Sequence, residues 1–336
     1  MITPFILDKE IFQCEHFKNL PIVRDTILED WSNHGVFIFG KQENHLNLVQ
    51  FVRKEFPIKY KDKWLTALTK FPFFIVNDDL IENFLVGSED FNEIKQLSEY
   101  IDSLFLTSIN FELVREFKNF KQISNDFEVL DYVCLKDSSF FKLSKVYSKK
   151  QIDSGEDVKN ILSRFKNLIS YTKKIVVIDR YLFGNDIKSA YSPHGSLSAI
   201  RRFFKFMAVN KIKVKNLQFV SSNKDLKADE VKKLFDDIFA SDSSLKSCCE
   251  KLIVVVRDDK SFSDSFHDRI VKTDHHYVEI GSGFGDAIRN KKTEKFMTFS
   301  CKSNCDVDYS NYFAHISRLD CSKTEAVFNY KKENPL

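Results

Sequence analysis

Apolar and polar residues alternate in two different ways along the chain, and the second half shows the clearer order. There, segments with apolar residues at helical spacing alternate with short apolar segments of strand length. Helices are expected at 155–171, 196–208, 227–239 and 244–250, and strands at 174–179, 214–220, 251–256, 268–273, 277–280 and 295–300. This order predicts an α/β fold with a mainly parallel or mixed sheet that helices cover on both faces.

The first half is less regular. Apolar spacing predicts helices at 44–55, 61–68 and 92–104, whereas 109–146 shows a β-rich alternation. We therefore expect a mixed α+β domain at residues 1–150 and the α/β domain at residues 151–336. The boundary rests on the change of pattern, because no Pro/Gly-rich linker marks it. Residues 1–150 contain neither a repeat nor a catalytic motif, so a regulatory, recognition or partner-binding role stays open.

The charge balance hides a difference between the halves. The chain has a net charge of +3, but residues 1–150 are net −4 (19 basic, 23 acidic) and residues 151–336 are net +7 (32 basic, 25 acidic). Glycine is scarce, with nine copies where about 23 are expected from a typical content of roughly 7%. This composition excludes collagen-like and low-complexity chains, and it makes a local cluster of glycines informative.

The chain shows no sign of export or of a metal centre. The first ten residues lack the cations and apolar run of a signal peptide, and the longest apolar stretches have only strand length. The seven cysteines are an odd number, so we expect reduced thiols in a cytoplasmic protein. Cys301, Cys305, His315 and Cys321 match no standard zinc spacing, and we expect neither a metal nor a cofactor.

One segment combines a nucleophile, a cation and a glycine-rich turn. It has the spacing His267-x-Arg269-x4-Asp274-x6-Gly281-Ser282. On a strand, His267 and Arg269 share a face, so an imidazole and a fixed cation would meet one phosphate. The turn at Gly281 lets the backbone approach a ligand, and a helix starting near residue 284 would add free N–H groups.

This spacing resembles the motif of the phospholipase D superfamily, His-x-Lys-x4-Asp-x6-Gly-Ser. The resemblance extends over roughly residues 170–320 and implies an α/β/α sandwich with a mixed sheet. It implies that His267 attacks phosphorus without a metal, that Arg269 and Ser282 hold phosphoryl oxygens, and that Asp274 orients a histidine. Two positions depart from the family: Arg269 replaces its lysine, and Phe284 stands where asparagine is usual.

Two branches of the superfamily look most similar. One branch is the C-terminal domain of microtubule-interacting-and-trafficking proteins. The chain resembles it in the sequence His-Asp-Arg, in the Gly-x-Gly-Phe that closes the motif, and in the segment 178–182. This resemblance implies a dimeric, non-catalytic binder of phosphoinositide membranes. Related domains of bacterial defence proteins imply cleavage of nucleic acid. The chemistry needs two histidines, and this chain has one motif, so we expect a homodimer.

Other residues give weaker support. Gly283 extends the glycine turn, Arg180 follows a predicted strand where α/β sheets place ligands, and His194 opens a helix. A basic segment without acidic residues could form a patch that binds the phosphates along a nucleic acid or a membrane surface. A solvated helix face explains the segment equally well. The members of this patch are Arg201, Arg202, Lys205, Lys211, Lys213 and Lys215.

The sequence thus favours a homodimeric, metal-independent phosphodiesterase, specifically a nuclease with a phosphohistidine intermediate acting in antiviral defence. One alternative is a non-catalytic module that binds phosphate, nucleic acid or an anionic membrane. Another is a structural subunit of a defence complex in which residues 1–150 bind a partner protein.

Overall fold

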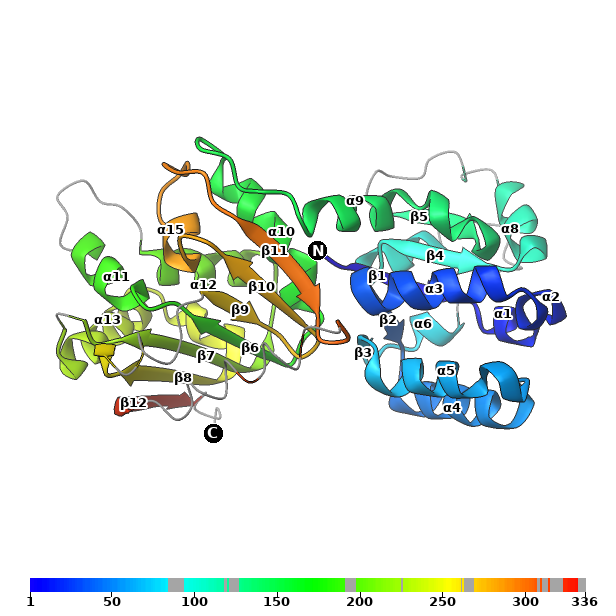
Figure 1. Ribbon diagram of the computed structural model, residues 1–336, viewed down its shortest axis with the longest axis horizontal. Coiled ribbons are helices and arrows are strands. Elements are labelled where there is room, and N and C mark those ends of the chain that lie inside the picture. Colours follow the sequence, from blue (N-terminus) through cyan, green and yellow to red (C-terminus); the bar gives the residue numbers. More distant parts are fainter. Residues whose placement is uncertain are drawn as a thin grey trace. The chain divides into compact units, whose positions relative to one another are not determined.

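The computed structural model describes residues 1–83, 94–117, 120, 127–190, 198–224, 226–260, 262, 269–306, 309, 314 and 323–331 (Figure 1). The chain divides into two compact units, Met1–Tyr147 and Ser148–Leu336, and each is described by itself. None of the helices in these ranges has the length and apolar character that a membrane span requires.

The first unit contains a parallel sheet with the strand order β3-β2-β1-β4-β5. The strands are β1 (Thr3–Leu7), β2 (Gly35–Phe39), β3 (Phe73–Ile75), β4 (Ser103–Leu106) and β5 (Glu128–Asp131). The helices are α1 (Lys9–Gln13), α2 (Glu15–Asn19), α3 (Pro21–His34), α4 (Gln42–Glu55), α5 (Ile58–Lys70), α6 (Leu80–Asn83), α8 (Ser108–Arg115) and α9 (Ser139–Tyr147). This alternation of strands and helices makes the unit α/β, not the α+β domain that the sequence predicted.

The β-rich prediction for residues 109–146 is wrong for most of that range. The segment contains α8, the short strand β5, a 3₁₀ segment η3 (Tyr132–Asp137) and α9. Thr107 begins α8 because its hydroxyl accepts a hydrogen bond from Asn110 N at 3.2 Å. Leu113 is one of the apolar residues of the alternation in 109–146, yet it lies on α8 and is 47% exposed. The predicted helix at 92–104 is confirmed only in part: residues 94–95 are α-helical and η1 (Gln96–Glu99) continues as a 3₁₀ helix, but residues 103–104 belong to β4.

Phenylalanine forms much of the core of the first unit. Phe5 on β1 stacks on Phe37 of β2, with ring centroids 5.2 Å apart, and meets Phe105 and Phe141 edge-on. Trp31 on α3 is fully buried and donates its indole N–H to Pro72 O at 2.6 Å. These contacts fasten the helices to the sheet through the aromatic side chains in which the chain is rich.

The second unit contains a mixed sheet with the order β11-β10-β9-β6-β7-β8-β12. The strands are β6 (Lys174–Ile178), β7 (Val214–Ser222), β8 (Cys249–Arg257), β9 (Ile270–Lys272), β10 (His276–Ile280), β11 (Phe299–Ser303) and β12 (Thr324–Lys331). Strands β6, β7 and β8 are parallel, and the others pair antiparallel to their neighbours. The mixed α/β architecture that the alternating pattern predicted is therefore present.

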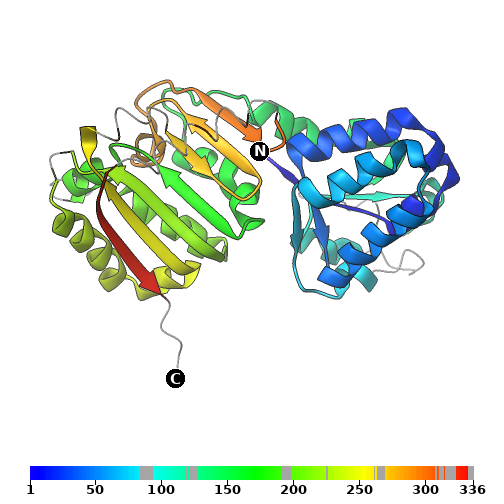
Figure 2. The same cartoon turned by 60° about the horizontal axis from the view of Figure 1, so that its bottom comes forward.

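Helices of the second unit pack on this sheet. They are α10 (Val158–Ser170), α11 (Leu182–Ala190), α12 (Ala199–Val209), α13 (Ala228–Ser241), the 3₁₀ segment η4 (Ser243–Cys248) and α15 (Phe284–Ile288). Figures 1 and 2 show α10, α12 and α13 along one face of the sheet. Phe219 of β7 packs there against Phe203, Phe204 and Phe235. The other face carries a smaller buried cluster that includes Phe262.

Candidate functional site

The segment around Arg269 meets the carboxyl end of β6. Because β9 runs antiparallel to β6 with Ile270 opposite Ile178, Arg269 lies beside Asp179, which directly follows β6. Asp179 is buried; its Oδ1 accepts from Tyr181 N at 3.1 Å and its Oδ2 from Gly285 N at 3.0 Å. One carboxylate therefore joins the end of β6 to the start of α15.

The glycine-rich turn completes this arrangement. Arg269 Nη1 donates to Gly281 O at 2.7 Å, and Ser282 follows, half-buried. Gly283 has a φ of 109°, in the left-handed region. A Cβ at this position would lie 2.6 Å from Asp179 Oδ2 and 2.9 Å from Arg269 Cδ. Only glycine leaves space for the aspartate and the arginine to approach the turn together.

Three cations surround the ring of Tyr181. The guanidinium carbons of Arg180 and Arg269 lie 5.3 and 5.5 Å from its centroid, and Lys224 Nζ lies at 5.3 Å. Arg180 follows β6 and Lys224 follows β7, and ends of adjacent parallel strands share one edge of the sheet. A cavity of about 190 Å³ lies here, and Lys188 adds a further cation to its lining.

The charge of this cavity is only partly balanced. Arg180 forms a bidentate pair with Asp259 at 2.9 and 2.8 Å, which lowers the pKa of that carboxyl. Burial raises the pKa of Asp179, although the nearby charge of Arg269 opposes this shift. In the described part of the chain, neither Lys224 nor Arg269 is within 4.0 Å of a carboxylate oxygen. The cavity is therefore positively charged and has room for a phosphate group.

Asp274 lies elsewhere. Its Oδ2 accepts from Thr172 Oγ1 at 2.9 Å and from Lys173 N at 2.6 Å, at the amino end of β6. The five residues from Arg269 to Asp274 cover roughly 16 Å along a strand. The role of Asp274 in orienting a histidine stays a prediction, because His267 lies outside the described residues. Among the described residues, the carboxylate of Asp274 caps the start of β6 and lies far from Arg269. The reason is that Arg269 precedes β9 and Asp274 follows it, so the two residues lie at opposite ends of that strand.

Two predicted site residues, His194 and His267, lie outside the described residues. The predicted basic patch is divided. Arg201 contacts Ser241 Oγ, and Arg202 donates to Arg289 O at 2.9 Å. Lys205 is exposed on α12.

The remaining members of the patch, Lys211, Lys213 and Lys215, lie around the start of β7. The eight-residue step along β7 puts them roughly 26 Å from the end that carries Lys224. Among the described residues, these three lysines therefore lie far from the end of the sheet that carries Arg269 and the glycine turn.

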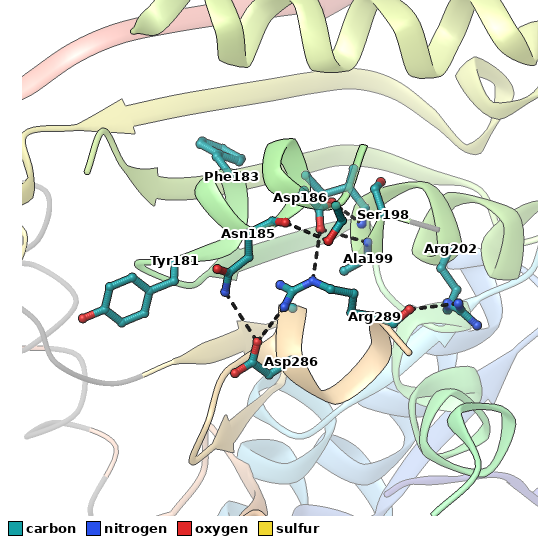
Figure 3. Close-up of polar contacts among 12 residues, drawn as sticks. Tyr181, Phe183, Asn185, Asp186, Ser198, Ala199, Arg202, Asp286 and Arg289 are labelled. Carbon is teal, nitrogen blue, oxygen red and sulfur yellow. Dashed lines mark hydrogen bonds and ion pairs between the residues drawn. The ribbon is translucent and has the colours of Figure 1, made fainter. Parts of the chain in front are cut away.

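A polar network supports the helices behind the cavity (Figure 3). Asp186 on α11 is fully buried and accepts from Ala199 N and Ile200 N, both at 2.9 Å, at the start of α12. Burial raises the pKa of Asp186 to about 6. Arg289 lies 3.9 Å from Asp186 Oδ1 and donates to Asp286 Oδ1 at 2.9 Å. These contacts link α11, α12 and α15.

Sequence reasoning missed Lys224, Lys188 and Tyr181. A usable signal existed for Lys224, because it follows a predicted strand just as Arg180 does. Polar residues at the carboxyl ends of adjacent parallel strands converge. Lys188 gave no such signal, since its position depends on how α11 packs.

Comparisons with known proteins identify no family. No family model and no curated protein matches the chain. Among solved structures, the archaeal chromatin protein TrmBL2, described with a novel mode of DNA binding, aligns at 10% identity and a TM-score of 0.25. The alignment spans 56% of this chain and 60% of that one. So low a score carries no argument about fold or function.

Proposed function

We propose that the second unit is a metal-independent phosphodiesterase of phospholipase D-like architecture that acts on nucleic acid. The observation that carries this proposal is the convergence of Arg180, Lys224 and Arg269 on Tyr181 at the carboxyl edge of the sheet. Arg269 belongs to the sequence motif, and His267 precedes it by two residues. A phosphate held in this cavity would lie beside the segment that carries the nucleophile.

The chemistry would proceed in two displacements. The imidazole of His267 would attack phosphorus, forming a P–N bond while the bond to the leaving oxygen breaks. A second histidine would protonate that oxygen, and water would then hydrolyse the phosphohistidine. Because the chain has one motif, the second histidine would be His267 of another copy. Arg269 would stabilise the charge on the non-bridging oxygens.

The decisive test uses fluorescent single-stranded DNA and RNA with EDTA present. We expect the wild-type chain to cut at least one of them, and His267→Ala to lose cleavage while retaining binding. Arg269→Ala and Lys224→Ala should each weaken binding about tenfold, since a charged contact contributes about 1.5 kcal/mol. Lys166→Ala, at an exposed position of α10 outside both the cavity and the basic segment, is the matched control and should bind like the wild type. Cleavage that persists in His267→Ala, or that needs a divalent metal, would refute the proposal.

A non-catalytic phosphate binder is the second candidate. It is favoured by the position of Asp274, which lies at the far end of β9 from Arg269. The same assay separates the two functions. Binding that depends on Arg269 and Lys224, together with no cleavage of either nucleic acid by the wild type, would identify a recognition module.

A further inference from the structure

A second cavity of the same unit lies between α10 and α12, and the phosphate site does not use it. Its volume is about 610 Å³. Val158 and Leu162 of α10 and Phe206 and Val209 of α12 form its apolar lining. Val209 is 82% exposed, so the groove leaves a large apolar side chain open to solvent. An exposed apolar lining of this kind is typical of a binding surface.

Cations border this apolar floor. They are Lys159, Arg202, Lys205 and Lys291, and the sole acid in the lining is Asp157. Asp157 already caps α10, where its Oδ1 accepts from Lys159 N at 2.8 Å. Within the residues that the structure covers, none of the four cations has a carboxylate oxygen within 4.0 Å. The groove is therefore complementary to an anion that also has an apolar part.

Arg202 is the most constrained of these cations. It lies half-buried on α12, and burial lowers its pKa although Asp157 opposes the shift. Its Nη2 donates to Arg289 O at 2.9 Å, and its buried Nε has no hydrogen-bond partner (Figure 3). A guanidinium that is fixed by one carbonyl and has no carboxylate of the described residues within 4.0 Å can receive an anion.

The dimensions favour a small molecule over a long peptide helix. Arg202, Lys205, Phe206 and Val209 follow the spacing of one helix face, and this wall extends for roughly 10 Å. A volume of about 610 Å³ lies in the range of small-ligand sites.

We propose that this groove binds a small amphipathic anion, with an alkyl or aromatic body on the apolar floor and a phosphate or carboxylate group beside Arg202. The lysines at the border, Lys159, Lys205 and Lys291, attract and hold the charged end. The site is separate from the Tyr181 cavity, and its existence does not depend on the phosphodiesterase proposal.

Isothermal titration of the full chain tests this with four probes: octyl phosphate, adenosine monophosphate, inorganic phosphate and octyl glucoside. We expect octyl phosphate or adenosine monophosphate to bind at least tenfold more tightly than inorganic phosphate and octyl glucoside. Whichever of these two probes binds more tightly shows whether the apolar part of the ligand is an alkyl chain or an aromatic ring. The proposal would be overturned if neither octyl phosphate nor adenosine monophosphate bound more tightly than inorganic phosphate and octyl glucoside.

Variants locate the binding in the groove. The double variant Lys159→Glu/Lys205→Glu should weaken the tighter amphiphile at least tenfold, and Val209→Ser should weaken it a few-fold. The matched control is Lys166→Glu/Lys215→Glu, which makes the same charge change at exposed positions outside the groove. A titration of Lys224→Ala reports on the Tyr181 cavity separately, because this variant weakens phosphate binding there. An equal loss in the control double variant, or a loss of the tighter amphiphile in Lys224→Ala but not in Lys159→Glu/Lys205→Glu, would refute the assignment.

Discussion

Gly283 shows how one residue permits the geometry of the candidate site. Its φ of 109° is unfavourable for side chains, and its missing Cβ leaves space for Asp179 and Arg269. Gly155 has a similar φ of 84°, yet nothing lies within 4 Å of the position of its absent Cβ. The two glycines therefore separate backbone strain from steric crowding.

We predict that Gly283→Ala lowers the free energy of unfolding by about 3 kcal/mol, because strain and a clash add. Gly155→Ala should cost only about 1–2 kcal/mol, the conformational term alone. Urea denaturation measures both. Equal losses in the two variants would contradict the crowded packing of Gly283 against Asp179.

At the scale of the elements, the start of α12 is held by a buried carboxyl group. Its first N–H groups point at Asp186, which is fully buried on α11. The pKa of this carboxyl is raised from 3.8 to about 6, so the folded state binds its proton more tightly than the unfolded state does. Stability from this group is therefore greatest below pH 4 and falls as pH rises to about 6.

We expect Asp186 to remove about 3 kcal/mol of stability between pH 4 and pH 6. Asp186→Asn should abolish this contribution, whatever its effect on absolute stability. The measurement is the difference between the pH slopes of wild-type and variant unfolding free energy, since other carboxyls contribute equally to both. Parallel slopes would show that Asp186 does not titrate in this range.

Element packing also rests on a buried ion pair. Arg164 of α10 is almost fully buried, and its Nη2 lies 2.6 Å from Glu156 Oε1. The same side chain donates to Lys150 O at 2.7 Å and Gln151 O at 3.2 Å, which fixes the segment before α10.

Arg164→Met should therefore cost about 3–5 kcal/mol, because Glu156 is left without its partner. The exposed Lys166→Met on the same helix should change stability by less than about 0.5 kcal/mol. Thermal unfolding of both variants measures the difference. A small loss for Arg164→Met would mean that the pair adds little to the packing of α10.

At the scale of the whole molecule, the proposed chemistry needs two chains. A homodimer would have twice the chain mass of 39.4 kDa, which sedimentation measures. If both copies of His267 act at one site, a wild-type chain paired with His267→Ala is inactive. Co-refolding equal amounts should then leave about a quarter of the wild-type activity instead of about half. Retention of half the activity would assign the reaction to single chains.

The sequence by itself determined much of the second unit. Apolar runs such as 174–178 and 251–256 are strands in any α/β arrangement, because burial on both faces requires them to be apolar. The motif pattern predicted Arg269 on a strand at 268–273 and the glycine turn before a helix, from local periodicity and from the conformational freedom of glycine. In the structure β9 begins one residue after Arg269, and α15 follows the turn.

Only the tertiary structure decided which of these residues meet. Asp274 and Arg269 are close in sequence, but Asp274 lies at the amino end of β6 and Arg269 at its carboxyl end. Lys224 and Arg180 are distant in sequence, yet both lie at the carboxyl ends of the parallel strands. Strand pairing joins segments that are distant in sequence, so the local periodicity of apolar residues cannot predict it. The parallel sheet of the first unit escaped prediction for the same reason: its short strands and the helix begun by Thr107 carry no distinctive pattern of their own.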